Sequence, residues 1–242
     1  MNSQELQNQH AVVTGASSGM GLGIAEMLAS AGANVTLLGR SESKVKRETE
    51  RLAGLGYAVQ GRALDVRDAA AVAEAYAAAA STDGRLDIAV HAAGVVYPGS
   101  IAEADPEQWA DVIGTNVLGV MYGSREALRR MQAGATIVNV SSTSGREPSK
   151  VAAYSASKHA VTGFTECLRR EAAPLGVRVV CLEPGLVYSE FNRHMPEDFQ
   201  QLRREVPSLT PGEVAEVLKR VITLPSHVDL GEIVLRPVSQ VA

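Results

Sequence analysis

Short apolar runs alternate with longer amphipathic stretches along this chain. The short runs consist mainly of Val, Ile and Leu with little polar alternation, which is typical of parallel strands covered on both faces. We expect seven strands, at residues 11–13, 34–38, 58–64, 86–90, 136–140, 177–182 and 232–235. The amphipathic stretches predict six helices, at residues 19–31, 41–54, 68–80, 105–133, 153–173 and 212–223.

Residues that favour helix ends support these boundaries. Ser41 and Asp68 are placed to cap helix N-termini, and Pro106 stands at the first position of another helix. Gly32 and Gly176 are placed to end helices. Strands and helices that alternate in this way form repeated βαβ units. The sequence therefore predicts an α/β fold with a doubly wound, parallel, seven-stranded sheet and helices on both faces.

One stretch breaks this rhythm. Residues 188–209 are polar, contain Pro196 and Pro207, and show no clear strand. We expect this segment to form a substrate lid over the edge of the sheet. Because no linker or repeat divides the rest, we expect residues 1–242 to form one domain that carries the lid.

Composition narrows the class of protein. The 242 residues have 23 Lys and Arg against 27 Asp and Glu, a net charge of −4, whereas binders of nucleic acid or anionic membranes normally carry a basic excess. Two cysteines are too few for a disulfide framework, and no His or Cys spacing indicates a metal site. The polar N-terminus predicts no signal peptide. We therefore expect a soluble, cytoplasmic protein that binds neither nucleic acid nor a membrane.

A glycine-rich turn follows the first predicted strand. Residues 14–23 read Thr-Gly-Ala-Ser-Ser-Gly-Met-Gly-Leu-Gly. Glycines at this spacing let the backbone turn tightly and bring a diphosphate against the free N–H groups of a helix N-terminus. No Lys follows them, which excludes a nucleoside-triphosphate loop. The alternative is that this turn serves only helix–strand packing. The position of the turn directly after the first strand favours dinucleotide binding.

The residue after the second strand bears on the choice of dinucleotide. An acidic residue there binds the ribose 2′-hydroxyl of NAD, whereas a basic one accommodates the 2′-phosphate of NADP. This chain has Arg40 and no acid, so we expect NADP(H) to be favoured over NAD(H); the plainer interpretation is an exposed Arg at a helix start. Asp65, after the third strand, is either an acceptor for the adenine amino group or a turn residue. We expect His91 to be a core histidine with a satisfied hydrogen bond.

Three reactive side chains follow the fifth strand. Ser142 stands at the carboxyl end of the strand, Tyr154 follows twelve residues later, and Lys158 stands four residues beyond Tyr154. On a helix, positions i and i+4 share a face, so the phenol and the ammonium point into the same crevice. A free phenol, with a pKa of about 10, is a sluggish acid or base at neutral pH, and a nearby ammonium lowers that pKa. The alternative is that Tyr154 and Lys158 are only a surface pair. The presence of Ser142 at the end of the preceding strand favours acid–base catalysis.

Taken together, these features resemble the short-chain dehydrogenases/reductases over residues 9–238. The resemblance implies a Rossmann-type fold and a catalytic tetrad of Asn116, Ser142, Tyr154 and Lys158. It also implies cofactor contacts from the glycine turn, the ends of the next strands and a Pro-Gly segment after the sixth strand. These contacts are Gly15, Ser17, Ser18, Gly19, Met20, Gly21, Arg40, Asp65, Val66, Ala92, Ala93, Gly94, Tyr154, Lys158, Pro184, Gly185, Val187 and Ser189.

The chain departs from the family pattern at a few positions. The family usually has Asn where His91 stands, and that Asn supports the central sheet. Ser18 stands where NADP-preferring members often carry a second basic residue, and Ser189 replaces a Thr but keeps the hydroxyl. Ser141 competes with Ser142 for the catalytic role, and the spacing to the following glycine favours Ser142.

The resemblance implies hydride transfer between NADP(H) and the carbon of a ketone, aldehyde or alcohol. It implies that Tyr154 exchanges the proton and that Ser142 donates a hydrogen bond to the same oxygen. Lys158 would lower the pKa of the phenol and hold the nicotinamide ribose, and Asn116 would position a water or Lys158. Two alternatives are a reductase of carrier-bound 3-oxoacyl chains, which a basic patch beside the cleft would favour, and a non-enzymatic NADP-binding redox sensor, which the presence of both Tyr and Lys disfavours.

The substrate pocket is expected at loops that follow the carboxyl ends of the strands. Its expected lining residues are Tyr97, Ser144, Arg146, Tyr188, Phe191 and His194. This mixture suits a small-molecule carbonyl or alcohol such as a hydroxy acid, a β-keto ester or a larger ketone, with Arg146 or Arg193 as candidates to meet a carboxylate.

Surplus apolar surface predicts self-association. Helices 105–133 and 153–173 carry apolar residues on more than one face, among them Val117, Leu118, Ala160 and Phe164. One face of each helix covers the sheet, so we expect the rest to be buried in a homodimer or homotetramer.

Overall fold

The computed structural model describes residues 5–80, 83–189, 191, 197, 200–201 and 207–240. Seven strands form one parallel sheet in the order β3-β2-β1-β4-β5-β6-β7. The strands are β1 (His10–Thr14), β2 (Asn34–Gly39), β3 (Val59–Ala63), β4 (Ile88–His91), β5 (Thr136–Val140), β6 (Arg178–Pro184) and β7 (Glu232–Leu235). The predicted doubly wound α/β fold is confirmed, with each strand within two residues of its predicted ends.

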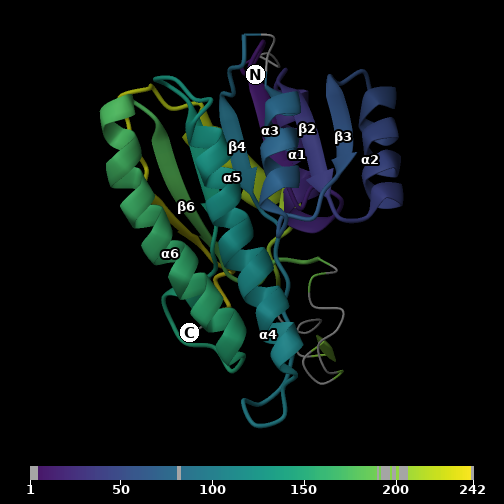
Figure 1. Ribbon diagram of the computed structural model, residues 1–242, viewed down its shortest axis with the longest axis vertical. Helices are drawn as coiled ribbons and strands as arrows, with labels where there is room; N and C mark the ends of the chain where they lie inside the picture. Colours follow the sequence, from purple (N-terminus) through teal and green to yellow (C-terminus); the bar gives the residue numbers. More distant parts are fainter. Residues whose placement is uncertain are drawn as a thin grey trace.

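Helices cover both faces of this sheet, and each face has its own apolar core. On one face lie α1 (Gly19–Ser30), α2 (Glu42–Gly54) and α8 (Pro211–Ile222). On the other lie α3 (Ala69–Ala79), α5 (Gly119–Leu128) and α6 (Ala152–Ala172), which Figure 1 shows side by side in front of the sheet. Two short 3-10 turns, η2 (Thr143–Gly145) and η3 (Ala173–Leu175), flank α6.

The predicted helix ends are largely confirmed by side-chain caps. The hydroxyl of Ser41 accepts a hydrogen bond from the N–H of Lys44 at the start of α2, and Asp68 caps α3 in the same way. Thr210 and Glu213 form a reciprocal capping box on α8 that the sequence reading did not single out. These caps satisfy N–H groups that have no partner inside the helix.

The single helix predicted over residues 105–133 is confirmed over residues 106–128, but it contains a π-helical turn and its predicted end at residue 133 is wrong. The structure has α4 (Pro106–Ile113), a π-helical turn η1 (Gly114–Leu118) and then α5, which ends at Leu128. The chain leaves the helix because the carbonyl of Arg130 accepts a hydrogen bond from the N–H of Leu86. Met131 still packs against the core from the turn, so the apolar pattern continues past the helix end.

The strand order creates a crevice at the carboxyl edge of the sheet. β1 pairs with β2 on one side and with β4 on the other, so the chains that leave β1 and β4 diverge to opposite faces. The glycine turn, Arg40 and the segments that follow β4, β5 and β6 all start at this edge. Among the described residues, no helix is both long and apolar enough to cross a membrane.

Candidate active site

The glycine turn closes β1 tightly onto α1. Gly15 and Gly19 have φ angles of +69° and +54°, a region that favours glycine. A Cβ atom on Gly21 would lie 2.4 Å from the carbonyl oxygen of Gly15, so only glycine fits there. Among the described residues, no side chain caps the N-terminus of α1, where Ser18 is the N-cap. The first N–H groups of α1 therefore face the crevice as donors for an anion.

The segment after β6 meets this turn. A Cβ atom on Gly19 would lie 3.1 Å from the Cβ of Ser189. The N–H of Leu186 donates to the side-chain Oε1 of Gln240 at 2.9 Å, and its carbonyl accepts from the N–H of Leu209, also at 2.9 Å. The N–H of Tyr188 donates to the Leu209 carbonyl at 2.7 Å, so the two described ends of the predicted lid are joined. Most of residues 190–206 lies outside the described part of the chain.

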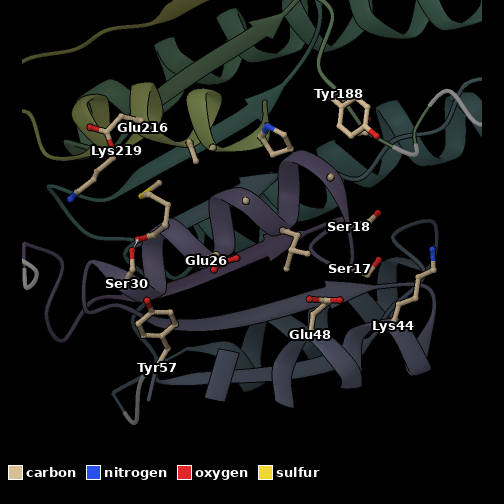
Figure 2. A pocket seen from close by; sticks show the side chains of 18 of the residues that line it. Ser17, Ser18, Glu26, Ser30, Lys44, Glu48, Tyr57, Tyr188, Glu216 and Lys219 are labelled. Atoms are coloured by element: carbon tan, nitrogen blue, oxygen red, sulfur yellow. Dashed lines mark hydrogen bonds between the residues drawn. The ribbon is translucent and has the colours of Figure 1, made fainter. Parts of the chain in front are cut away.

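A groove runs from the glycine turn over α1, between α2 and α8. It has a volume of about 730 Å³, and Figure 2 shows Ser17, Ser18 and Lys44 grouped at one end. Arg40 is exposed at the end of β2, and its charge helps to lower the pKa of Asp65. Hydroxyl and cationic groups therefore surround the place where the end of β2 meets the glycine turn, which is suited to a phosphate.

Asp65 is held by a neighbouring arginine. The Nε and Nη2 atoms of Arg67 donate to its carboxylate at 3.0 and 2.5 Å, and these hydrogen bonds are the main cause of its lowered pKa. Arg67 also donates to Asp111 on α4 at 2.9 Å. Asp65 is thus ionised and still partly exposed at the predicted adenine position, next to the buried Val66.

The small residues after β4 pack directly against the glycine turn. A Cβ atom on Gly15 would lie 2.8 Å from the carbonyl carbon of Ala92, and the N–H of Ala93 donates to the hydroxyl of Thr14 at 3.3 Å. Gly94 follows, and a Cβ on it would approach Asn116 Oδ1 at 3.4 Å and Lys158 Nζ at 3.9 Å. The segment 92–94 therefore connects the predicted cofactor turn to the predicted catalytic residues.

Asn116 lies in the π-helical turn and is fully buried. Its Oδ1 accepts from the N–H of Val95 at 2.8 Å, while its Nδ2 donates to the Val95 carbonyl and to the hydroxyl of Ser157, both at 3.0 Å. Isolated π-helical turns concentrate at functional sites because they redirect one side chain. Here the turn lets Asn116 join the segment after β4 to α6.

The two adjacent serines after β5 differ in what their hydroxyls contact. Ser141 is buried and donates to the carbonyl of Lys158 at 3.0 Å, beside the hydroxyl of Thr162 at 2.9 Å. Ser142 lies at the start of η2, where its hydroxyl accepts from the N–H of Ser144 and lies 3.4 Å from the Pro184 carbonyl. Because the Ser141 hydroxyl is bound to Lys158 and Thr162 of α6, this geometry favours Ser142 over Ser141 as the candidate catalytic serine.

Tyr154 and Lys158 lie one turn apart on α6, as predicted. The Lys158 Nζ atom lies 5.7 Å from the centroid of the Tyr154 ring and donates to the Val140 carbonyl at 2.9 Å. Burial lowers the pKa of Lys158 to about 8. The Phe191 ring lies 5.9 Å from the Tyr154 ring, so one predicted pocket residue contacts the phenol directly.

His91 is a core residue, as predicted. Its Nδ1 lies 2.7 Å from Asn139 Oδ1, and burial lowers its pKa to about 4. The Nε2 atom has no hydrogen-bond partner among the described residues, and neither has the hydroxyl of Tyr76, whose ring stacks on the imidazole. The sheet therefore holds a neutral histidine at the end of β4.

Arg146 does not face the predicted pocket as a free cation. Its guanidinium donates to the carboxylates of Glu183 on β6 and Glu232 on β7. Tyr97 is similarly committed, because its hydroxyl donates to Asp111 at 2.6 Å. The Ser144 carbonyl accepts from Ser155, and Tyr188 is 76% exposed. The remaining pocket predictions, Arg193 and His194, lie outside the described residues.

Sequence reasoning missed three contributors to this region. Ser157, which contacts Asn116, stands inside the Tyr154–Lys158 motif, so its helical phase was a usable signal. Glu183 was visible as an acid next to Pro184, although nothing local linked it to Arg146. Gln240 had no signal, because its contact with Leu186 depends on where the chain returns after β7.

A doubly wound sheet with a glycine turn at its switch in strand order is typical of nucleotide-binding proteins, and comparison with known proteins gives the family. The family model for short chain dehydrogenases matches residues 9–200, so the chain belongs to this family. An uncharacterized oxidoreductase of Staphylococcus saprophyticus is 37% identical over 238 residues, which are 97% of this chain and 99% of the relative.

Two solved structures match over nearly their whole length. A short chain dehydrogenase from Burkholderia cenocepacia in complex with NADP has a TM-score of 0.87 at 26% identity, covering 96% of this chain and 98% of that one. The closed form of a serine dehydrogenase complexed with NADP+ has a TM-score of 0.87 at 30% identity, covering 96% of each chain.

The residues at the carboxyl edge fit a dinucleotide. A Cβ on Gly21 would fill the turn, and the N-terminus of α1 lacks a side-chain cap within the described chain. Lys158 is a buried cation at the other end of the same edge, close to Gly94. The glycine turn and the uncapped helix N-terminus suit the diphosphate, and the buried ammonium is a donor that the hydroxyls of a ribose can accept from.

Proposed function

We propose that this oxidoreductase uses NADP(H) to interconvert a ketone or aldehyde and the corresponding alcohol, with Tyr154 as the general acid and base. The observation that carries the proposal is the position of Tyr154 and the buried Lys158 on one turn of α6, beside the end of β5. Ser142 follows that strand end, and the glycine turn lies across the same edge of the sheet.

Each part of the edge would hold one part of the cofactor. The N-terminus of α1 and residues 15–21 suit the diphosphate, and Arg40 with Ser17 and Ser18 suits the 2′-phosphate. Asp65 and Val66 would contact the adenine, and residues 92–94 and 184–189 would line the nicotinamide side, because both segments follow strand ends at this edge. NADPH, when bound, supplies the hydride.

The proton chemistry belongs to the protein. As the carbonyl oxygen gains charge, Tyr154 donates its phenolic proton to that oxygen, and in the reverse direction the phenolate accepts the proton. Ser142 donates a hydrogen bond to the same oxygen and stabilises the developing charge. Lys158 favours the phenolate by its positive charge, an effect that burial strengthens because little water screens it.

Asn116 supports this arrangement from the π-helical turn. Its side chain is bound on three sides, to both backbone groups of Val95 and to the Ser157 hydroxyl. It therefore keeps the cofactor-facing segment after β4 at a fixed distance from the helix that carries Tyr154 and Lys158. A role in positioning a water molecule or Lys158 for proton relay is consistent with this placement.

The preference for NADP(H) rests on Arg40 and on the absence of an acid at the end of β2. The Burkholderia and serine dehydrogenase structures, both complexed with NADP, support the same choice. Lys44 stands with Ser17 and Ser18 at the end of the groove, so a second cation is close to the turn even though Ser18 is not basic.

A panel of carbonyl compounds tests this function. Oxidation of NADPH and NADH is followed with ethyl acetoacetate, 1-tetralone and acetoacetyl-CoA, and reduction of NADP+ with L-serine. Turnover of any carbonyl compound with NADPH, or of L-serine with NADP+, supports the proposal, and the preferred compound gives the substrate class. Preference for acetoacetyl-CoA would support the 3-oxoacyl alternative. Binding of NADPH without turnover of any compound would contradict an enzymatic role and favour the redox-sensor alternative.

We also propose that the protein is a homodimer or homotetramer. Ile113 and Leu118, at the junction of α4, η1 and α5, are each 40% exposed. Ala160 is exposed and Phe164 half-buried on the neighbouring α6, whereas Val117 is buried within the fold and adds nothing to this surface. Apolar side chains of this size on adjacent helices are typical of a surface that a second subunit covers.

A further inference from the structure

We propose that Arg146 is a positioning residue that holds the Ser142 turn in register with the Pro184–Gly185 segment. This proposal rests on the proposed function, because it concerns how the hydrogen-bond donor for the substrate oxygen is aligned with the nicotinamide side of the site. Arg146 follows η2 directly, so its backbone belongs to the turn that Ser142 begins.

The guanidinium of Arg146 reaches across two strand ends. Its Nε donates to Oε2 of Glu183 and its Nη2 to Oε2 of Glu232. These carboxylates raise the pKa of Arg146, with Glu183 as the larger contribution, so the guanidinium keeps its positive charge. One side chain thus joins the turn after β5 to β6 and β7.

Glu183 depends on this contact. Its side chain is 0% exposed. Its other oxygen, Oε1, lies 3.4 Å from the Cys181 thiol and 3.5 Å from the Thr162 hydroxyl. Arg146 is the one cation paired with it among the described residues. A buried carboxylate that loses its partner is strongly unfavourable, whereas neutralising both partners costs much less.

The opposite side of the Ser142 turn is anchored to α6. Ser155 donates to the Ser144 carbonyl at 2.9 Å, and Ser141 donates to the Lys158 carbonyl. A Cβ on Gly145 would lie 2.8 Å from the same Lys158 carbonyl, so the turn lies flat against the helix. With α6 on one side and Arg146 bound to β6 on the other, the turn has little freedom to shift.

Glu183 immediately precedes Pro184, whose carbonyl lies 3.4 Å from the Ser142 hydroxyl. If Arg146 is removed, the Glu183 carboxylate is buried without a cation, and we expect the end of β6 to shift so that this carboxylate reaches water. That movement changes the alignment of residues 184–189 with Ser142. Ser189 reaches the glycine turn at Gly19, but Arg40 and the hydroxyls of Ser17 and Ser18 follow β2 and β1, on the other side of the crevice. We therefore expect the adenosine side of the site to be much less affected than the nicotinamide side.

The test compares Arg146→Met with the double variant Arg146→Met/Glu183→Gln. Arg169→Met is the matched control, because Arg169 also bridges two carboxylates, Glu166 and Asp229, at similar exposure but away from the site. For each protein, binding of NADPH and of 2′,5′-ADP, which lacks the nicotinamide, is measured by titration. Steady-state kinetics with the best panel ketone and thermal melting complete the set.

We expect Arg146→Met to lower kcat about tenfold or more, since small misplacements of reacting groups carry costs of this size. NADPH binding should weaken about fivefold while 2′,5′-ADP binding stays the same within about twofold. The double variant should recover most of both losses, and Arg169→Met should match the wild type. If Arg146 merely stabilised the fold, its loss would weaken the binding of NADPH and of 2′,5′-ADP alike. Neutralising Glu183 would then not restore kcat.

Other outcomes decide against the proposal. Wild-type kcat and NADPH affinity in Arg146→Met would overturn it, as would equal weakening of NADPH and 2′,5′-ADP. If Arg146→Met fails to fold, the folded double variant and Arg146→Lys, which keeps the charge but cannot bridge both carboxylates, are compared instead; wild-type kinetics in Arg146→Lys then overturn the proposal. A wild-type protein that binds no NADPH would contradict the proposed function itself, which is a separate result.

Discussion

The Nζ atom of Lys158 lies 5.7 Å from the centroid of the Tyr154 ring while it donates a hydrogen bond to the Val140 carbonyl. Lys158 is 4% exposed, and no carboxylate of the described residues contributes to its pKa. Burial therefore lowers the pKa of Lys158 to about 8. The protein holds a desolvated positive charge next to a phenol, an arrangement that favours function over stability.

Lys158→Met should stabilise the fold and abolish turnover. The folded-state pKa lies below the ordinary value of 10.5, so the cost of burying the charge is present at pH 7 and fades as the pH rises from about 8. We expect the free energy of unfolding at pH 7 to rise by about 1–3 kcal/mol, reduced by the lost bond to Val140. Urea unfolding measures it, with the exposed Lys150→Met as control. A less stable variant would contradict this expectation.

His91 should make the protein sensitive to acid. Its folded-state pKa of about 4 lies below the ordinary 6.5, so between these values the unfolded chain binds a proton that the folded chain does not. Stability should fall by roughly 3 kcal/mol at most as the pH drops from about 6.5 to about 4. His91→Asn should flatten this part of the profile, whereas His159→Asn, on the surface of α6, should not. Parallel profiles for wild type and His91→Asn would contradict the assignment.

Arg40 should determine the cofactor preference. The wild type is expected to have a higher kcat/KM with NADPH than with NADH, because the guanidinium meets the 2′-phosphate. Arg40→Ala should remove most of that preference by weakening NADPH alone. Arg62→Ala, an exposed arginine on β3 paired with Glu74, serves as control. Equal efficiency with both cofactors in the wild type would refute the preference.

The apolar surface around Leu118 should be an interface between subunits. Light scattering at micromolar concentration is expected to give the mass of a dimer or tetramer. Leu118→Lys should lower that mass by placing a charge in the interface, whereas Leu55→Lys, at an exposed leucine after α2, should leave it unchanged. A monomeric wild type would rule out this interface.

The local pattern was enough to predict most of the fold. A parallel strand covered on both faces is a continuous apolar run, so β5, which is buried throughout, was predicted at the residues where it occurs. The edge strand β7 was also predicted at its observed residues, because its Ile-Val-Leu run is apolar although half of it is exposed. The helix predicted over residues 105–133 was extended too far, and its π-helical turn was missed, because apolar periodicity reveals neither that turn nor the competing bond between Leu86 and Arg130. Periodicity reports which face is buried, and it continues through turns that stay packed on the core.

The candidate site was predictable where spacing alone places side chains together. Tyr154 and Lys158 share a helix face, and Ser142 stands at a strand end, so their convergence on one edge follows from topology. Arg146 was assigned to the pocket because nothing in its neighbourhood showed Glu183, which is distant in sequence and adjacent only through the strand order. Contacts that long side chains make across strands cannot be predicted from the local sequence, because they depend on which strands are neighbours in the sheet.

The central claim is that Tyr154 transfers the proton. Tyr154→Phe keeps the ring and its contact with Phe191, so stability should change little. NADPH binding should stay near the wild-type value because Lys158 and the glycine turn remain. The variant lacks the proton donor, so kcat should fall by about 10²–10⁴.

The decisive measurement is kcat of Tyr154→Phe with the best panel ketone, alongside NADPH binding by fluorescence and Tyr122→Phe, on α5, as control. The account predicts normal NADPH binding with turnover reduced at least about a hundredfold, and a control that matches the wild type. Turnover of Tyr154→Phe within a few-fold of the wild type, with NADPH bound normally, would contradict it.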